Sequence, residues 1–342
     1  MVASGAGGNG DPQQMVAPPI GLKVVCMDSR PDIPLPDFPR TLAHCPDIGE
    51  TCMRRRDMLK GIALGGAAIA MARVAPASAK PALDGADAKL ARLERRHGGR
   101  LGVAILDTDS GRREGYRDDE RFLMCSTFKL LLAAAVLERV DRGEDKLDRH
   151  IVFGKDALLD YAPTAKQHVG SPGMTVAQLC EAAVTLSDNT AANLLLASIG
   201  GPPAVTAYAR GLGDTITRLD RTEPTLNRPS GDRDTTTPWS MLVDMQKLLL
   251  GNALSDTSRR QLIDWMLACK TGADSLRAGL PGTWREGDKT GQGMQANNDI
   301  AILWPPRRKP LLVAAYYMTD HTDFKARKAV LAEVGRIVAA LA

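Results

Sequence analysis

The sequence predicts a two-domain α+β (or α/β) protein in which both ends of the folded chain contribute to one domain of sheet and helices. A segment at 101–106 and three segments near the C-terminus alternate with the two-residue period of strands. The long stretch between them follows the period of helices instead. We therefore expect residues 80–124 and 270–342 to form the α/β domain, with residues 125–269 inserted as an all-helical domain.

Capping and periodicity signals place each element. Ala86–His97 is typical of an amphipathic helix ended by glycine, and 101–106 is a strand that a turn joins to a second strand around Tyr116. The insert begins with an apolar helix after Ser126, for which Gly143 suits the C-terminal end. Further helices are expected at 175–187, 191–199, 202–211, 238–250 and 258–269. Strands are expected at 285–293, 299–304 and 311–318, followed by a closing helix at 326–341.

The N-terminal part carries the pattern of an export signal. Residues 1–52 are rich in Gly and Pro without a sustained period, which indicates a disordered extension or a start codon assigned too early. Residues 53–79 combine a basic start, a short apolar run and a small-residue end. The pair Arg55-Arg56 indicates the twin-arginine type, which exports folded proteins. We expect cleavage near Ala79 and a periplasmic, secreted or wall-associated protein without a stable membrane anchor.

The composition of the chain argues against several classes of partner and cofactor. The formal charge of +4 over 342 residues is small, and no Lys/Arg stripe with interleaved aromatics appears, which argues against nucleic acid as a partner. The cysteines and histidines lack metal-ligand spacing, so no metal is expected, and no organic cofactor is implied. Cys125, Cys180 and Cys269 lie in apolar helical contexts, which predicts buried free thiols. A monomer is the default expectation.

Ser126 and Lys129 lie three residues apart at the start of the apolar helix. Positions i and i+3 share a helix face, so we expect Lys129 to reach the Ser126 hydroxyl. The first turn of a helix also offers unpaired N–H groups and a positive dipole. A serine that attacks a carbonyl needs a neighbouring base and N–H donors for the oxyanion, and this stretch can supply both.

Two further short motifs suit the same chemistry. Ser187-Asp188-Asn189 follows a helix end, where the hydroxyl can pass a proton to a leaving nitrogen and the amide can bind a carbonyl. Lys289-Thr290-Gly291 is expected on an inner strand, where the lysine raises the positive potential and the glycine lets a substrate approach the backbone. Taken singly, each motif also fits an ordinary turn or a solvated lysine.

A loop without period runs from about Arg221 to Asp234 and contains Glu223 and Asn227. A glutamate in such a loop is usually exposed. Four residues apart, however, the carboxylate and the amide can hold one water between them, with the glutamate as general base.

Ser-x-x-Lys, Ser-Asp-Asn and Lys-Thr-Gly in this order are the signature of class A β-lactamases and penicillin-binding proteins. With Glu223-Pro-Thr-Leu-Asn227 added, the chain resembles a class A serine β-lactamase across nearly all of residues 80–342. The resemblance implies an antiparallel sheet flanked by terminal helices, an inserted all-α domain, and an active site between them.

The resemblance also assigns roles. Ser126 is implied as the acylated nucleophile, with Lys129, or Glu223 acting through water, as the base of acylation. Ser187 is implied to protonate the ring nitrogen with help from Lys289, and Glu223 to activate the deacylating water. The implied substrate-binding residues are Tyr161, Asn189, Asn227, Thr290, Gly291 and Gln292. The N–H groups of Ser126 and Gln292 are implied as the oxyanion hole. Arg221 and Asp234 are implied to close the Glu223 loop as an ion pair.

Several positions depart from the family pattern. The Glu223 loop is shorter than usual, and the hairpin at 294–298 is short and lacks the arginine that many members use for the substrate carboxylate. Ser275 does not replace that arginine, which leaves Lys328 as the candidate. Cys180 matches one half of a disulfide that some members of the family have, but Ala133 stands at the position of its partner. Cys125 matches another such cysteine, and Gly293 stands at the position of its partner, so no bridge is expected.

Two alternatives share most of these motifs. A penicillin-binding DD-peptidase has the serine, lysine and Lys-Thr-Gly set but lacks a deacylating glutamate. The presence of Glu223 and Asn227 therefore argues against this alternative. A β-lactam-sensing protein is acylated and then stops. A misplaced Glu223 in the shortened loop produces the same behaviour, a protein that traps penicillin without turnover.

Overall fold

A five-stranded antiparallel sheet, with strand order β2-β1-β9-β8-β7, joins the two ends of the folded chain. Its strands are β1 (Arg100–Asp107), β2 (Arg113–Tyr116), β7 (Arg285–Gln292), β8 (Ala296–Trp304) and β9 (Leu311–Met318). The structure is a computed structural model and describes residues 85–342. The full pairing of β1 with β9, from Arg100 opposite Met318 to Asp107 opposite Leu311, confirms the predicted fold class.

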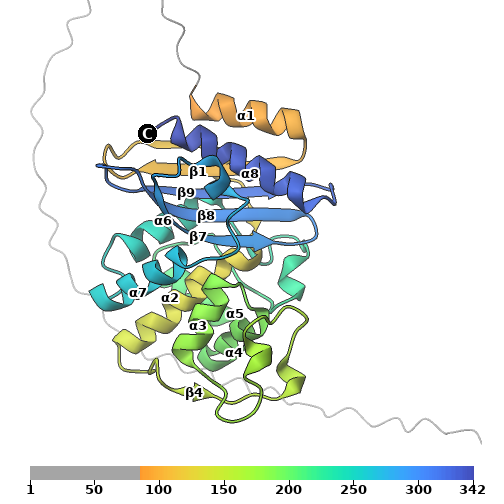
Figure 1. Cartoon of the computed structure of the whole chain (residues 1–342), viewed down its shortest axis with the longest axis vertical. Helices are drawn as coiled ribbons and strands as arrows, with labels where there is room; N and C mark the ends of the chain where they lie inside the picture. Colours follow the sequence, from red (N-terminus) through yellow and green to blue (C-terminus); the bar gives the residue numbers. More distant parts are fainter. Residues whose placement is uncertain (1–84) are drawn as a thin grey trace, which may run out of the picture. The chain divides into compact units, whose positions relative to one another are not determined.

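Both faces of the sheet are apolar and covered by helices. In β9, Val313, Ala315 and Tyr317 belong to the core beneath α1 (Ala86–His97) and α8 (Phe324–Ala339). The residues between them, Leu312, Ala314 and Tyr316, belong to the core shared with the inserted helices. Successive side chains of a strand point to opposite faces, so one strand contributes to both cores. Figure 1 shows α1 and α8 together along one side of the sheet.

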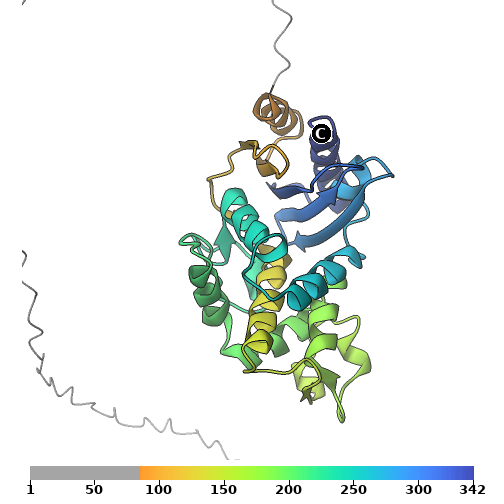
Figure 2. The ribbon, with the colours of Figure 1, turned by 90° about the vertical axis from the view of Figure 1, so that its left-hand side faces the viewer.

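The inserted part is organised around α2 (Phe128–Asp141), whose first ten residues are all buried. A helix that is apolar on all sides belongs in the centre of a bundle. The helices around it are α3 (Val176–Thr185), α4 (Asn189–Ile199), α5 (Pro202–Gly211), α6 (Pro238–Leu249) and α7 (Asp256–Leu267). α6 also packs on β1 and β9, and α7 on β7, which joins this part to the sheet (Figures 1 and 2).

Several short elements were not predicted, because segments of two to four residues carry no measurable period. β3 (Phe122–Leu123) pairs with β6 (Thr235–Thr236), and β4 (His150–Ile151) pairs with β5 (Met174–Thr175). The short 3₁₀ helices are η1 (Cys125–Thr127), η2 (Lys155–Ala157), η3 (Ala165–Gln167), η4 (Thr225–Asn227) and η5 (Leu276–Gly279). The β3–β6 pair matters most for the site. It joins the residues just before the Ser126 turn to the residues just after the Glu223 loop.

Two expectations about the sheet are wrong. Lys289 lies on β7, which is the edge strand and not an inner one. It is nevertheless fully buried, because the inserted helices cover that edge. The hairpin after β7 is shorter than 294–298, since β8 already begins at Ala296. The described residues form one compact unit. The expected division into two domains stays a prediction.

The predicted signal segment and the extension before it lie outside the described residues. Among the helices of residues 85–342, none combines the length and the apolar composition that a membrane span requires.

Candidate active site

A cavity of about 470 Å³ lies beside β7 and collects most of the residues singled out in the sequence. Those that line it are Ser126, Tyr161, Ser187, Asn189, Asn227, Thr290, Gly291 and Gln292. The other three catalytic candidates, Lys129, Glu223 and Lys289, have fully or almost fully buried side chains and hydrogen bond to the residues on its wall. Around Ser126 the cavity therefore presents hydroxyl and amide groups to a ligand, with Lys129, Glu223 and Lys289 held behind them.

Ser126 lies in the η1 turn directly before α2, which is close to the predicted first helical turn. The turn begins with a strained residue, because Cys125 has a left-handed φ of 46°. Strand β7 approaches it very closely, since a Cβ on Gly291 would lie 2.7 Å from the Met124 carbonyl oxygen. The Ser126 hydroxyl donates to Glu223 Oε1 at 3.2 Å. The serine is thus 8% exposed and already paired with a carboxylate.

Lys129 is completely buried and points from α2 into the base of the site. Its ammonium group lies 3.0 Å from Glu223 Oε1 and donates to Asn189 Oδ1 at 2.7 Å and to the Ser187 carbonyl at 2.9 Å. Burial lowers the Lys129 pKa, and the charge of Glu223 opposes that shift. Lys129 was predicted to reach the Ser126 hydroxyl. In the structure the two side chains are linked through Glu223 Oε1, which contacts both of them.

Glu223 is only 3% exposed, in contrast to the usual position of a loop glutamate. Asn227 Nδ2 donates to Glu223 Oε2 at 2.5 Å, so amide and carboxylate are in direct contact. Asn193 holds the Glu223 peptide from both sides, accepting from its N–H at 3.0 Å and donating to its carbonyl at 2.9 Å. The sequence analysis missed Asn193, although its spacing of one helical turn from Asn189 on α4 was a usable signal.

Ser187 and Lys289 meet on the opposite side of the cavity. Lys289 Nζ donates to Ser187 Oγ at 3.1 Å and to the Thr290 carbonyl at 2.8 Å. Burial, with the nearby Lys129 charge, lowers the Lys289 pKa to about 8. Ser187 has a left-handed φ of 59°, a backbone strain of the kind that clusters at functional sites.

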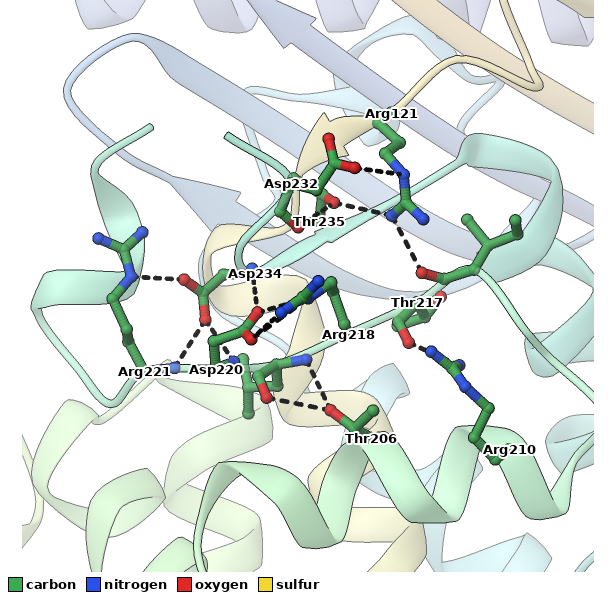
Figure 3. Close-up of polar contacts among 12 residues, drawn as sticks. Arg121, Thr206, Arg210, Thr217, Arg218, Asp220, Arg221, Asp232, Asp234 and Thr235 are labelled. Atoms are coloured by element: carbon green, nitrogen blue, oxygen red, sulfur yellow. Dashed lines mark hydrogen bonds and ion pairs between the residues drawn. The ribbon is translucent and has the colours of Figure 1, made fainter. Parts of the chain in front are cut away.

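The loop that carries Glu223 is closed at its neck by the predicted ion pair (Figure 3). Arg221 Nε donates to Asp234 Oδ2 at 2.6 Å, while Asp234 Oδ1 accepts from the N–H groups of Asp220 and Arg221. Asp220 Oδ2 accepts from the Asp234 N–H at 3.1 Å in return. Asp234 is fully buried, so the pair is shielded from solvent and salt.

Comparison with known proteins supports the resemblance. A sequence model of the beta-lactamase enzyme family matches residues 85–341. The structure of an ancestral (GNCA) class A β-lactamase is 59% identical and matches with a TM-score of 0.74, covering 75% of this chain and 100% of that one. The chain belongs to the class A serine β-lactamase family.

Curated β-lactamases match most of the chain. β-Lactamase L2 of Stenotrophomonas maltophilia is 50% identical, over 72% of this chain and 82% of that protein. β-Lactamase OXY-1 of Klebsiella oxytoca is 46% identical, over 75% of this chain and 88% of that protein. Residues 85–341, which the family model matches, contain the whole cavity and every residue described around it.

Within this β-lactamase site, Tyr161 is half exposed at the entrance and donates to the Leu186 carbonyl at 3.1 Å. Asp188 between the two motif residues has a structural task that the sequence analysis did not assign. Its buried carboxylate accepts from the N–H groups of Thr164, Ala165 and Ala191. It thereby caps α4 and holds the Tyr161 loop against the cavity.

The outer end of the β-lactamase cavity lies between Thr290 and α8. The Thr290 hydroxyl is 2.5 Å from that of Thr271, and Ser275, Asn297 and Lys328 line the same end. Lys328 Nζ is 3.6 Å from the exposed Asp274 carboxylate. The buried side-chain oxygen of Asn297 has no hydrogen-bond partner among the described residues. Lys270 and Asp274 also line the cavity, so this end combines two lysines and one carboxylate with several neutral polar groups.

The three cysteines of the described chain are buried free thiols, as predicted. Burial raises the pKa of the Cys125 thiol, which keeps it unreactive beside the nucleophile. A Cβ on Gly293 would lie 2.9 Å from Cys125 Sγ, which agrees with the predicted proximity of these two residues.

Proposed function

We propose that this chain hydrolyses β-lactam antibiotics through an acyl-serine intermediate and so confers resistance to them. The observation that carries the proposal is the position of Glu223 Oε1, which accepts from the Ser126 hydroxyl and lies 3.0 Å from the Lys129 ammonium group. One carboxylate next to both nucleophile and lysine can serve acylation and the later attack of water. Penicillins and cephalosporins are the proposed substrates.

In the proposed acylation step, Ser126 Oγ attacks the lactam carbonyl while its proton passes to the Glu223–Lys129 pair. The N–H groups of Ser126 and Gln292 hold the oxyanion, a contribution of about 3–4 kcal/mol for each donor. The Ser187 hydroxyl then gives its proton to the ring nitrogen as the C–N bond breaks. The proton taken from Ser126 passes through Lys129, whose Nζ lies 3.4 Å from Ser187 Oγ, and restores that hydroxyl. Lys289 supports that transfer through its 3.1 Å hydrogen bond to Ser187 Oγ.

In the proposed deacylation step, Glu223 takes a proton from a water molecule that attacks the acyl carbonyl. Asn227, which contacts Glu223 Oε2, and Asn193, which fixes the Glu223 peptide, keep the carboxylate in place. The bond to Ser126 Oγ breaks, and the serine receives from Glu223 the proton that the carboxylate took from the water.

Substrate binding is proposed to use both walls of the cavity. The Asn189 amide and the β7 backbone around Gly291 and Gln292 bind the amide side chain, with Tyr161 at the entrance. Thr290 and Ser187 contact the substrate carboxylate. Lys328 supplies the positive charge that an arginine gives in other members of the family.

We further propose that the enzyme is exported through the twin-arginine machinery, is cleaved near Ala79 and acts as a periplasmic or secreted monomer. The basic start, short apolar run and small-residue end of residues 53–79 support this proposal. N-terminal sequencing of the exported protein tests the cleavage, and replacing Arg55 and Arg56 by Lys should block export.

The test of the reaction is to mix the purified protein and its Glu223→Gln variant with a chromogenic penicillin or cephalosporin. Continuous turnover by the wild type and a single stoichiometric burst by the variant support a β-lactamase that deacylates through Glu223. A single burst from both proteins would identify a penicillin-binding protein or a sensor instead. Asp264→Asn, an exposed change on α7, serves as the matched control.

A further inference from the structure

Arg327 is a buried arginine on α8, 2% exposed, with exposed residues before it at the start of the helix. Buried arginines are usually paired with a carboxylate. Within residues 85–342, no ion pair is formed by Arg327, and its guanidinium group binds main-chain carbonyl oxygens instead. Such hydrogen bonds restrict the positions of the accepting carbonyl groups, because a guanidinium group has five donors in a fixed plane.

The three carbonyl oxygens come from two separate segments. Arg327 Nε donates to His321 O at 2.5 Å in the segment between β9 and α8. Nη1 donates to Gly293 O at 3.2 Å and Nη2 to Met294 O at 2.7 Å. Gly293 and Met294 form the turn between β7 and β8 and directly follow Gln292. The start of α8 and this turn lie at the same end of the sheet (Figure 1).

The turn that Arg327 holds is also the place where the walls of the active site meet. A Cβ on Gly293 would lie 2.9 Å from the Asn227 carbonyl oxygen and 2.9 Å from Cys125 Sγ. The turn is therefore packed between the Glu223 loop and the residue before the nucleophile. A small shift of Gly293 moves the backbone of Gln292, whose N–H is one of the two proposed oxyanion donors.

We propose that Arg327 is a positioning residue for the oxyanion hole, which fixes the β7–β8 turn and with it the Gln292 N–H. This inference rests on the proposed function and extends it to a side chain outside the cavity. Charge-assisted hydrogen bonds to two consecutive carbonyls restrain both peptide planes of the turn. Thr319 N–H, which donates to Gln295 O at 2.8 Å, holds the far side of the turn but contacts neither Gly293 nor Met294.

Arg327→Met keeps the apolar length of the side chain and removes all three hydrogen bonds. Loss of a complete oxyanion donor costs about 10²–10³ in rate, so displacement of the donor should lower kcat/KM for acylation by about tenfold. The rate of deacylation, measured on preformed acyl-enzyme, should fall by a similar factor, because the attack of water on the acyl group places the oxyanion between the same two N–H groups. Arg327→Lys, which restores a cation and part of the bonding, should recover activity partly.

Hydrogen exchange of the 289–296 segment gives a readout that does not depend on turnover. Faster exchange there in Arg327→Met, with the rest of the protein unchanged, supports the proposal. Arg336→Met, an exposed change on the same helix, is the control and should leave both readouts at wild-type values. Lys328→Met separates the neighbouring residue, since it should weaken substrate binding without faster exchange.

Wild-type acylation and wild-type exchange in Arg327→Met would overturn the proposal. So would a loss of activity that matches a smaller folded fraction, measured by circular dichroism, with an unchanged rate of deacylation on preformed acyl-enzyme. If the methionine variant does not fold, Arg327→Lys carries the same two measurements, and unchanged values in it would also overturn the proposal. If the wild type is acylated but does not turn over, the proposed function fails while acylation by mass spectrometry and exchange still test Arg327.

Discussion

The main-chain carbonyl of Asp234 accepts a hydrogen bond from the Met124 N–H at 2.9 Å, two residues before the nucleophile. The side chain of the same aspartate accepts from Arg221 and closes the loop that carries Glu223. Asp234 itself has a left-handed φ of 58°. One buried residue therefore fixes the position of the Glu223 loop relative to Ser126, and the two reacting groups share an anchor.

Arg221→Ala should slow deacylation by about tenfold, because the loop neck loses its ion pair and Glu223 loses its fixed position relative to the acyl group. The lost Arg221 bond to the Arg228 carbonyl adds to this loosening. Rapid-quench measurement of acyl-enzyme decay checks the prediction. Arg218→Ala removes a partly exposed pair with Asp220 at the same neck but leaves the Arg221–Asp234 pair in place, so it should have little effect. An unchanged decay rate in Arg221→Ala would contradict the role of the ion pair.

Lys328→Met should raise KM by about tenfold for β-lactams with a free carboxylate, since it removes a cation at the outer end of the cavity. The effect on kcat should be small, because Lys328 is proposed to contact the substrate carboxylate and not the reacting carbonyl, and so acts mainly on ground-state binding. Steady-state kinetics with a carboxylate substrate and its methyl ester check the prediction. Lys325→Met on the exposed side of α8 is the control. Equal KM changes for acid and ester would argue against a carboxylate contact.

The pH profile of acylation should fall on the alkaline side with a midpoint near 8. Lys289 supports proton transfer as a cation, and burial with the Lys129 charge lowers its pKa to about 8. Raising the pH through this value removes the proton and the positive potential. Measurements of kcat/KM from pH 6 to 10 check the midpoint. Lys289→Arg should hold its charge and move the fall to higher pH, and a profile that stays identical in that variant would assign the titration to another group.

Stability should fall as the pH rises from about 4 to about 9, and Asp244 should account for part of the fall. Asp244 is fully buried on α6, and burial, with the neighbouring Asp214 carboxylate, raises its pKa to about 9. Its pKa is higher in the folded than in the unfolded state, so the stabilisation is complete below the unfolded value and is lost as the pH approaches 9.

Asp244→Asn should therefore raise the melting temperature at pH 8 by roughly 3–6 °C and flatten the pH dependence. Thermal melts at pH 4, 6 and 8 check both effects. Asp264→Asn, an exposed change on α7, should leave the profile unchanged. A variant with the wild-type slope would show that Asp244 does not titrate in this range.

Much of the site was predictable because its reactive residues lie in short sequence motifs. Ser126, Ser187 and Lys289 are each recognisable within a few residues of sequence, and all three meet at one cavity. Asn193 and Arg327 were not predicted, since their roles depend on a loop or turn that is distant in the sequence. The edge position of β7 was missed for a similar reason, because its buried pattern resembles that of an inner strand.

The sequence by itself determined the helices, the strands and the kinds of catalytic group, because periodicity, capping and motif chemistry act over a few residues. Tertiary structure alone decided which atoms meet. Ser126 and Glu223 are 97 residues apart, and their contact exists only because the Glu223 loop is closed by Asp234 against the nucleophile turn. The direct contact of Lys129 with Glu223, and the restraint of the β7–β8 turn by Arg327, likewise depend on how separate elements pack, which no local pattern specifies.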